Sequence, residues 1–181
     1  MKKVIAIVAL SFVGIAAKAQ VASTATQTVN LNLSNAIELT FTGNNSATGA
    51  TVNLAFNTVN DYANGVESAT QELKVRSNKK FGVTVKTSGA SFTYTGSTTP
   101  APVMPVSVLG LKVIANGTGG TIASPFSTTA YTAMSNTAAN LISNGLNGGN
   151  QTFSIKYEAE PGFAYPAGTY TTDVVYTATQ L

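Results

Sequence analysis

Short runs of alternating apolar and polar residues recur along this chain. Alternation with a period of two places one side of a strand against a core and the other in water. The apolar positions that carry it are Val29, Leu31 and Leu33; Ile37, Leu39 and Phe41; Val52, Leu54 and Phe56; Leu73 and Val75; Phe81, Val83 and Val85; Phe92 and Tyr94; Val106, Val108, Leu111 and Val113; and Phe153, Ile155 and Tyr157. Roughly eight to ten strands without a long helical pattern predict an all-β sandwich.

The last run follows a turn rich in Pro and Gly. Residues 165–170 read Tyr-Pro-Ala-Gly-Thr-Tyr, and residues 171–179 form a Val/Tyr/Thr run that includes Val174 and Tyr176. Tyr170 has the setting of a tyrosine corner, in which a Tyr just inside a strand of an immunoglobulin-like sandwich turns its hydroxyl back onto the preceding loop. The strand with this corner is the next-to-last one, whereas this sequence stops at Leu181. We therefore expect an immunoglobulin-like antiparallel β-sandwich that can lack its final strand.

Several connections are predicted from local composition. Residues 60–65 read as a turn because Asn, Asp and Gly tolerate positive φ. Residues 77–80 read as a solvated turn of a hairpin between the runs at Val75 and Phe81. Gly110 indicates a β-bulge. Residues 116–150 are ambiguous, since Ala138, Leu141 and Ile142 fit either one helical turn or a short strand.

The first residues indicate export. Lys2 and Lys3 form a positive n-region, residues 4–16 are apolar, and Ala17-Lys18-Ala19 is a cleavage site of the A-x-A type. The apolar run is shorter than the roughly 18 to 20 residues that span a membrane. Residues 1–19 are therefore expected to be a signal peptide and residues 20–181 one domain, in the periplasm, at the cell surface or outside the cell, with no membrane span.

The formal net charge of +3 comes from the predicted signal peptide. Lys2, Lys3 and Lys18 belong to the removed segment, so the remaining acidic and basic residues balance. Only 9% of the residues are charged, against roughly 25% in ordinary domains. No nucleic-acid partner is expected for a domain without net positive charge.

The chain contains no His and no Cys, which excludes Ser-His-Asp and Cys-His catalysis and zinc sites built from those ligands. Glu158 and Glu160 are the strongest remaining candidates for chemistry, because paired carboxylates serve glycosidases and bind calcium. On the run with Phe153, Ile155 and Tyr157 they fall on the opposite side, toward water. We expect no catalytic residue, no metal site and no cofactor.

The signal, the alternation at Val29, Leu31 and Leu33, and the turn that leads from Tyr165 into the final Val/Tyr/Thr strand together resemble the secreted subunits of chaperone-usher fimbriae and their spore-coat-U-type relatives. The resemblance implies a sandwich that lacks its last strand and is completed by a strand from a periplasmic chaperone and then from the neighbouring subunit. Such completion uses the main-chain groups of an open edge and pockets for alternate side chains.

The leading hypothesis is therefore a structural surface or fimbrial subunit that joins like subunits by strand complementation. Its interface residues are predicted to be Val29, Leu31, Leu33, Val174 and Tyr176, with residues 20–34 serving as a donor strand or as the first strand of the same sandwich. The alternative is a secreted carbohydrate- or surface-binding module that uses aromatic residues. The candidates for that role are Tyr62, Phe92, Tyr94, Phe126 and Tyr131.

Overall fold

The computed structural model describes residues 22–181. The predicted signal peptide and its cleavage site lie outside the described residues. Ser34–Leu181 forms one compact unit, and residues 22–33, called the arm below, belong to a separate unit. Within residues 22–181, no helix has the length and apolar character needed to cross a membrane.

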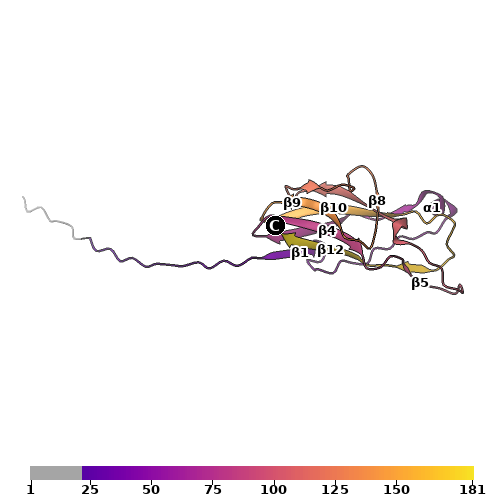
Figure 1. Ribbon diagram of the computed structural model, residues 1–181, viewed down its shortest axis with the longest axis horizontal. Coiled ribbons are helices and arrows are strands. Elements are labelled where there is room, and N and C mark those ends of the chain that lie inside the picture. Colours follow the sequence, from indigo (N-terminus) through magenta and orange to yellow (C-terminus); the bar gives the residue numbers. More distant parts are fainter. Residues whose placement is uncertain (1–21) are drawn as a thin grey trace, which may run out of the picture. The chain divides into compact units, whose positions relative to one another are not determined.

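Two antiparallel sheets make up most of the compact unit (Figure 1). The first has the order β1-β3-β10-β6-β8, from β1 (Ile37–Phe41), β3 (Gln71–Ser77), β10 (Gly148–Ala159), β6 (Leu109–Asn116) and β8 (Thr132–Ala133). A short β2 (Val66–Glu67) pairs with the end of β10. The second has the order β12-β4-β9-β7, from β12 (Val174–Gln180), β4 (Phe81–Thr87), β9 (Ala139–Gly145) and β7 (Thr121–Ile122).

Three short elements complete the unit. A two-stranded sheet joins β11 (Thr169–Thr171) to β5 (Thr93–Thr95), α1 spans Val59–Asn64, and the 3-10 helix η1 spans Val106–Val108. The predicted all-β sandwich is confirmed. In immunoglobulin sandwiches the strands A, B, E and D form one sheet and C, F and G the other. Strands β1, β3, β10 and β6 follow the first order, while β4 and β12 pair as C and F. The place of strand G corresponds to the outer edge of β12.

The core lies between the two sheets and consists of predicted alternating positions together with Leu141 and Ile142 of β9. Its largest fully buried apolar side chains, each less than 2% exposed, are Leu73, Val75, Phe81, Val83, Val85, Leu111, Val113, Leu141, Ile142, Phe153 and Ile155. Burying one such side chain contributes about 1.5 to 3 kcal/mol. All of them belong to Ser34–Leu181, so this unit has a complete core of its own.

The two ends of the sandwich differ in the elements they carry. At one end, Gln180 Nε2 donates to Ala36 O (2.8 Å) and to Asn78 Oδ1 (2.9 Å), so the start of the unit, the Ser77–Lys80 turn and the end of β12 meet. We call it the turn end. The helix end carries α1, β5, β11 and residues 159–163. Figure 1 shows α1 and β5 on the side opposite the mark for the C-terminus.

Two predictions, the hairpin after Val75 and the bulge at Gly110, are corrected. The runs at Val75 and Phe81 are not a hairpin, because β3 and β4 belong to different sheets and residues 78–80 cross between them. The ladder of β6 and β10 is irregular at Ser154 and Ile155, not at Gly110. Gly110 instead leaves room for Tyr131, whose Cβ lies 2.9 Å from where a Cβ of residue 110 would be.

Residues 60–65 are not a simple turn, because most of them belong to α1. Thr58 and Asp61 form a capping box, in which each side chain accepts from the other residue's backbone N–H. This pattern is legible in the sequence as Thr-x-x-Asp. The ambiguous residues around Leu141 form β9. Residues 22–36 include no strand, although the alternation at Val29, Leu31 and Leu33 predicts one.

The tyrosine corner is confirmed in its hydrogen bond and corrected in its setting. Tyr170 Oη donates to Pro166 O at 2.9 Å, as the turn sequence predicts. The strand around Tyr170, however, is β11, which pairs with β5 rather than continuing into β12. The final predicted strand is therefore two strands separated at residues 172–173.

Candidate functional site: the open edge of the sandwich

Strand β12 is the first strand of the second sheet, and its burial differs from that of its neighbour. It pairs with β4, and no other strand of the described chain pairs with its outer side. Its inward-facing side chains Val174, Tyr176 and Ala178 pack on the core but are only half-buried. The inward-facing residues of β4 are at most 1% exposed. We call the outer side of β12, with these half-buried side chains, the open edge.

Strand β1 contributes the adjoining edge of the first sheet. Leu39 and Phe41 of β1 are also half-buried and pack on the core. The Phe41 and Tyr176 rings meet edge to face, with centroids 6.2 Å apart and an interplanar angle of 82°. Edge strands of both sheets therefore present partly covered apolar side chains at the same place.

Half-buried apolar side chains also alternate in the chain between β1 and α1. Val52, Leu54 and Phe56 are half-buried against the core and alternate with exposed residues, as the sequence predicts. The predicted strand is nevertheless not formed, since residues 51–57 belong to no ladder in the described structure. Its side chains alternate as in a strand, but its backbone pairs with no strand of the described chain.

Tyr176 anchors β12 to the opposite sheet. Its hydroxyl lies 2.7 Å from that of Tyr157, and its ring centroid lies 6.4 Å from that of Phe153. Burial raises the pKa of Tyr157 to about 12 and that of Tyr176 well above its ordinary value, so one neutral hydroxyl donates to the other at physiological pH. The hydroxyl of Tyr176 is thus desolvated although the residue as a whole is half-buried. This contact holds β12 in place.

The predicted interface residues fall into two groups. Val174 and Tyr176 lie at the open edge, on the inward side of β12. Val29, Leu31 and Leu33 lie in the arm and are 74%, 82% and 90% exposed. A stable strand rarely leaves alternate apolar side chains in water, because it is stabilised by burying them.

Three further residues of the open edge were not predicted as interface. Ala178 continues the alternation of Val174 and Tyr176, so the sequence carried a signal for it. Leu39 and Phe41 were predicted only as strand residues. Nothing in their local pattern states that β1 is an edge strand, because edge position depends on the pairing of distant segments.

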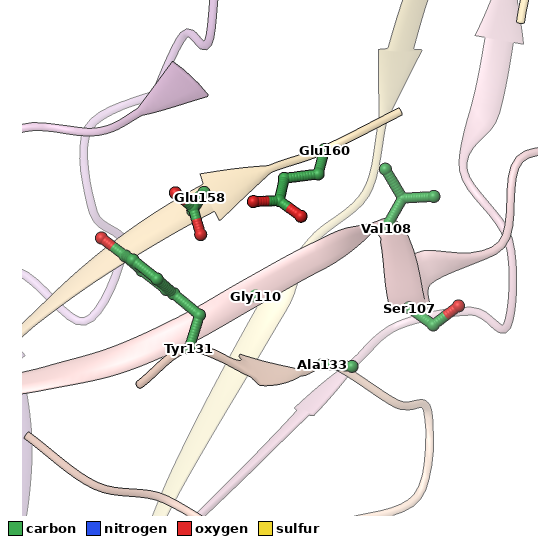
Figure 2. A pocket seen from close by; sticks show the side chains of 7 residues that line it. All are labelled: Ser107, Val108, Gly110, Tyr131, Ala133, Glu158 and Glu160. Atoms are coloured by element: carbon green, nitrogen blue, oxygen red, sulfur yellow. The ribbon is translucent and has the colours of Figure 1, made fainter. Parts of the chain in front are cut away.

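Glu158 and Glu160 line a shallow pocket of about 200 Å³ on the outer side of the first sheet (Figure 2). Tyr131 and Gly110 form part of its wall. Phe153, Ile155 and Tyr157 face the core, so the prediction that both carboxylates lie on the opposite side is confirmed. Partial burial, then Glu160 and Glu67, raise the pKa of Glu158. No group of three or more acidic residues within residues 22–181 is arranged to hold a metal ion.

Glu67 is the centre of a polar cluster beside this pocket. Its carboxylate accepts from Lys156 Nζ at 2.8 Å, from Tyr131 Oη at 2.5 Å and from Lys112 Nζ at 3.4 Å. Lys112 Nζ also lies 4.2 Å from the centroid of the Tyr131 ring. The hydrogen bonds from Lys156 and Tyr131 lower the pKa of Glu67 from its ordinary value of 4.5 to about 2.

We expect the contribution of Glu67 to stability to depend on pH. A carboxyl whose pKa is lowered by folding stabilises the fold above its unfolded pKa, and this stabilisation is lost as the pH falls through the folded pKa. The difference in urea midpoint between the wild type and Glu67→Gln should therefore be full at pH 6 and shrink between about 4.5 and 2. A difference that stays constant over this range would contradict the assignment.

The aromatic residues considered for carbohydrate binding do not form one platform. Phe126 is buried, and Tyr131 belongs to the Glu67 cluster. Tyr94 packs on Tyr170 with centroids 5.0 Å apart. Tyr62 stacks on Phe163 at 5.7 Å, and Phe163 is 68% exposed. Phe163 lies at the helix end and was not singled out from the sequence, since it stands alone in a Pro/Gly-rich loop.

No family model matches the chain, and no curated protein matches it. Among solved structures, it is similar to a chain of a chaperone-usher pilus, with 10% identity over 90% of this chain and 100% of that chain and a TM-score of 0.41. It is also similar to a family 123 glycoside hydrolase from Clostridium perfringens, with 11% identity over 80% of this chain and a TM-score of 0.37. The chain spans 25% of that hydrolase. Both similarities are too distant to identify a family.

Proposed function

We propose that this protein is an exported, non-enzymatic structural subunit of a surface assembly, and that like subunits join by strand complementation at the open edge. The observation that carries the proposal is the burial of β12. Its inward-facing side chains are half-buried, although they stand on the same core as the fully buried ones of β4. A strand added beside β12 would cover them and use its main-chain groups.

The composition of β12 supports an edge that receives a strand. Monomeric proteins protect exposed edges with Lys, Pro or inward-pointing charges. Residues 174–180 read Val-Val-Tyr-Thr-Ala-Thr-Gln and contain none of these. An unprotected edge with high β-propensity pairs with other chains unless a dedicated strand covers it.

The arm has the properties of that dedicated strand. Its apolar residues Val29, Leu31 and Leu33 share one side in an extended conformation. Fully burying each would contribute about 1.5 to 3 kcal/mol. Strand transfer between copies produces polymers, whereas an arm that covers its own β12 produces a monomer. We propose transfer between copies, with a periplasmic chaperone as the partner that covers the edge before assembly.

Peptide complementation tests this function. The body Ser34–Leu181 contains the whole core, so it should fold without the arm yet fail to polymerise. A peptide of residues 20–33 should raise its melting temperature. At a peptide concentration of 100 times Kd the gain is about 2.7 kcal/mol, which corresponds to roughly 5 to 10 °C for a domain of this size.

The matched control is the same peptide with Val29, Leu31 and Leu33 replaced by Ser, which should not shift the melting temperature. Absence of any shift with the native peptide would refute strand complementation by the arm. A chain from Gln20 that stays monomeric at high concentration, with the amides of residues 22–33 protected from hydrogen exchange, would show that each arm covers its own sandwich.

A further inference from the structure

The charged residues of the compact unit are distributed unevenly between its two ends. Three of the ten Lys and Arg residues precede residue 22, so the described chain contains seven basic and seven acidic residues. Lys74 lies in the middle of β3 and Glu72 is the second residue of this strand, so their opposite charges cancel in the count for β3. At the turn end stand three basic residues and one acidic residue, namely Arg76, Lys79, Lys80 and Glu38. The turn end therefore has an excess of two positive charges.

The helix end carries the opposite excess. Its acidic residues are Asp61, Glu67, Glu158, Glu160 and Asp173, and its basic residues are Lys86, Lys112 and Lys156. Glu67 forms ion pairs with Lys112 and Lys156. Lys86 of β4 lies near Asp173, because the next residue of β4, Thr87, pairs with Val174. Asp61, Glu158 and Glu160 belong to no ion pair of the described chain. The Asp61 carboxylate accepts from the backbone N–H groups of Asn57 and Thr58, and the charge of Lys112 acts on Glu158.

The two excesses do not neutralise each other within one copy. β12 alone covers about 20 Å between the ends, at about 3.3 Å per residue, and the Debye length at physiological ionic strength is about 8 Å. Lys79 and Lys80 are exposed in the turn between β3 and β4, and Glu160 is exposed at the helix end. Each end therefore presents its charge to a partner.

The helix end also exposes apolar side chains. Val59 on α1 is 73% exposed and Phe163 is 68% exposed. Val103 is 73% exposed and lies near β5. The backbone O of the next residue, Met104, accepts from the N–H of Phe92, which precedes β5. Exposed apolar side chains with a polar rim are typical of surfaces that bind another protein.

We propose that the helix end is a docking surface for the turn end of a second copy, with Lys79 and Lys80 opposite Asp61, Glu158 and Glu160. The inference rests on the proposed function, because arm transfer is what brings the copies together. The arm joins the body at Ser34, at the turn end, where Ser34 O accepts from Asn78 Nδ2. The body of the donor reaches the helix end of the acceptor when its arm lies antiparallel to β12.

Charge reversal in the chain from Gln20 tests the docking surface. We expect Lys79→Glu with Lys80→Glu to slow the initial rate of assembly, followed by light scattering, at least about tenfold at 0.01 M salt. The effect should disappear at 1 M salt, where the Debye length is about 3 Å. Adding Glu158→Lys and Glu160→Lys to the same chain restores opposite charges at the two ends, and the rate should return to within about threefold of the wild type.

Two single substitutions at different places provide the control. Lys80→Glu should slow assembly at low salt, whereas Lys74→Glu, the same charge change in the middle of the sheet, should not. The docking proposal would be overturned if the variant with all four substitutions assembled as slowly as the Lys79→Glu, Lys80→Glu variant. Assembly rates that do not respond to any charge reversal would overturn it too. The monomer could also bind sugars on a glycan array. If Phe163→Ala removes this binding and leaves assembly unchanged, the helix end is assigned to carbohydrate instead.

The two proposals fail differently. The body Ser34–Leu181 with Lys79→Glu and Lys80→Glu should still be stabilised by the arm peptide as much as the unchanged body, because neither lysine lies on β12. Loss of stabilisation by the peptide in the unchanged body refutes strand complementation. Normal stabilisation by the peptide, together with charge-insensitive assembly, refutes only the docking surface.

Discussion

Replacing Val29, Leu31 and Leu33 together by Asn is expected to reduce assembly at least about a hundredfold while leaving the body folded. Each replacement removes an apolar side chain that would contribute about 1.5 to 3 kcal/mol when buried at the open edge, and 2.7 kcal/mol already corresponds to a factor of about 100 in an equilibrium constant. Assembly is measured by light scattering and electron microscopy, and folding by far-UV circular dichroism.

The matched control changes the intervening residues of the arm. Asn30→Ser and Asn32→Ser alter the same segment on its other side, which would face water in a complementing strand. This variant should assemble at a rate close to that of the wild type. Equal losses in both variants would mean that the arm acts without a defined orientation, and strand complementation would lose its basis.

Replacing Phe153 by Ala is expected to cost about 3 to 5 kcal/mol of unfolding free energy. The side chain is 1% exposed in the centre of the core and its ring lies 6.4 Å from that of Tyr176, so its loss leaves a cavity and removes a contact that holds β12. Total stabilities of about 5 to 15 kcal/mol are usual for a domain, so the variant should lose a large share of its stability. Urea titration measures the change.

Phe163→Ala is the control for this substitution, because it deletes the same atoms from a side chain that is 68% exposed. It should change the unfolding free energy by less than about 1 kcal/mol, most of it from the lost stacking on Tyr62. Similar destabilisation by both variants would contradict the core described here.

Local pattern was sufficient for most of the strands and for the inward side of β12. The alternation around Phe153, Ile155 and Tyr157 predicted β10 and its buried side, and it also predicted that Glu158 and Glu160 face outward. The alternation of the final run indicated that Val174 and Tyr176 share one side of β12, and both pack on the core there. Their role at an interface stays a prediction. Tyr170 donates to the preceding loop as the Pro/Gly turn indicated. These features depend on residues close together in the chain.

Pairing between distant segments was decided by the tertiary structure. The alternation of Leu73 and Val75 followed by that of Phe81 and Val83 is the same for a hairpin and for a crossing between sheets, and only the ladders of β3 with β1 and β10, and of β4 with β12 and β9, distinguish them.

By itself, the sequence determined that this chain is an all-β protein with alternating strands, without His or Cys and with balanced charge outside the first residues. Only the tertiary structure decided that β12 and β1 are edge strands, and that Lys79 and Lys80 lie at the opposite end from Asp61 and Glu160. The physical reason is that alternation states which side of a strand is apolar but not which strand covers it. Edges and charged ends arise from contacts between residues far apart in the chain, which no local period records.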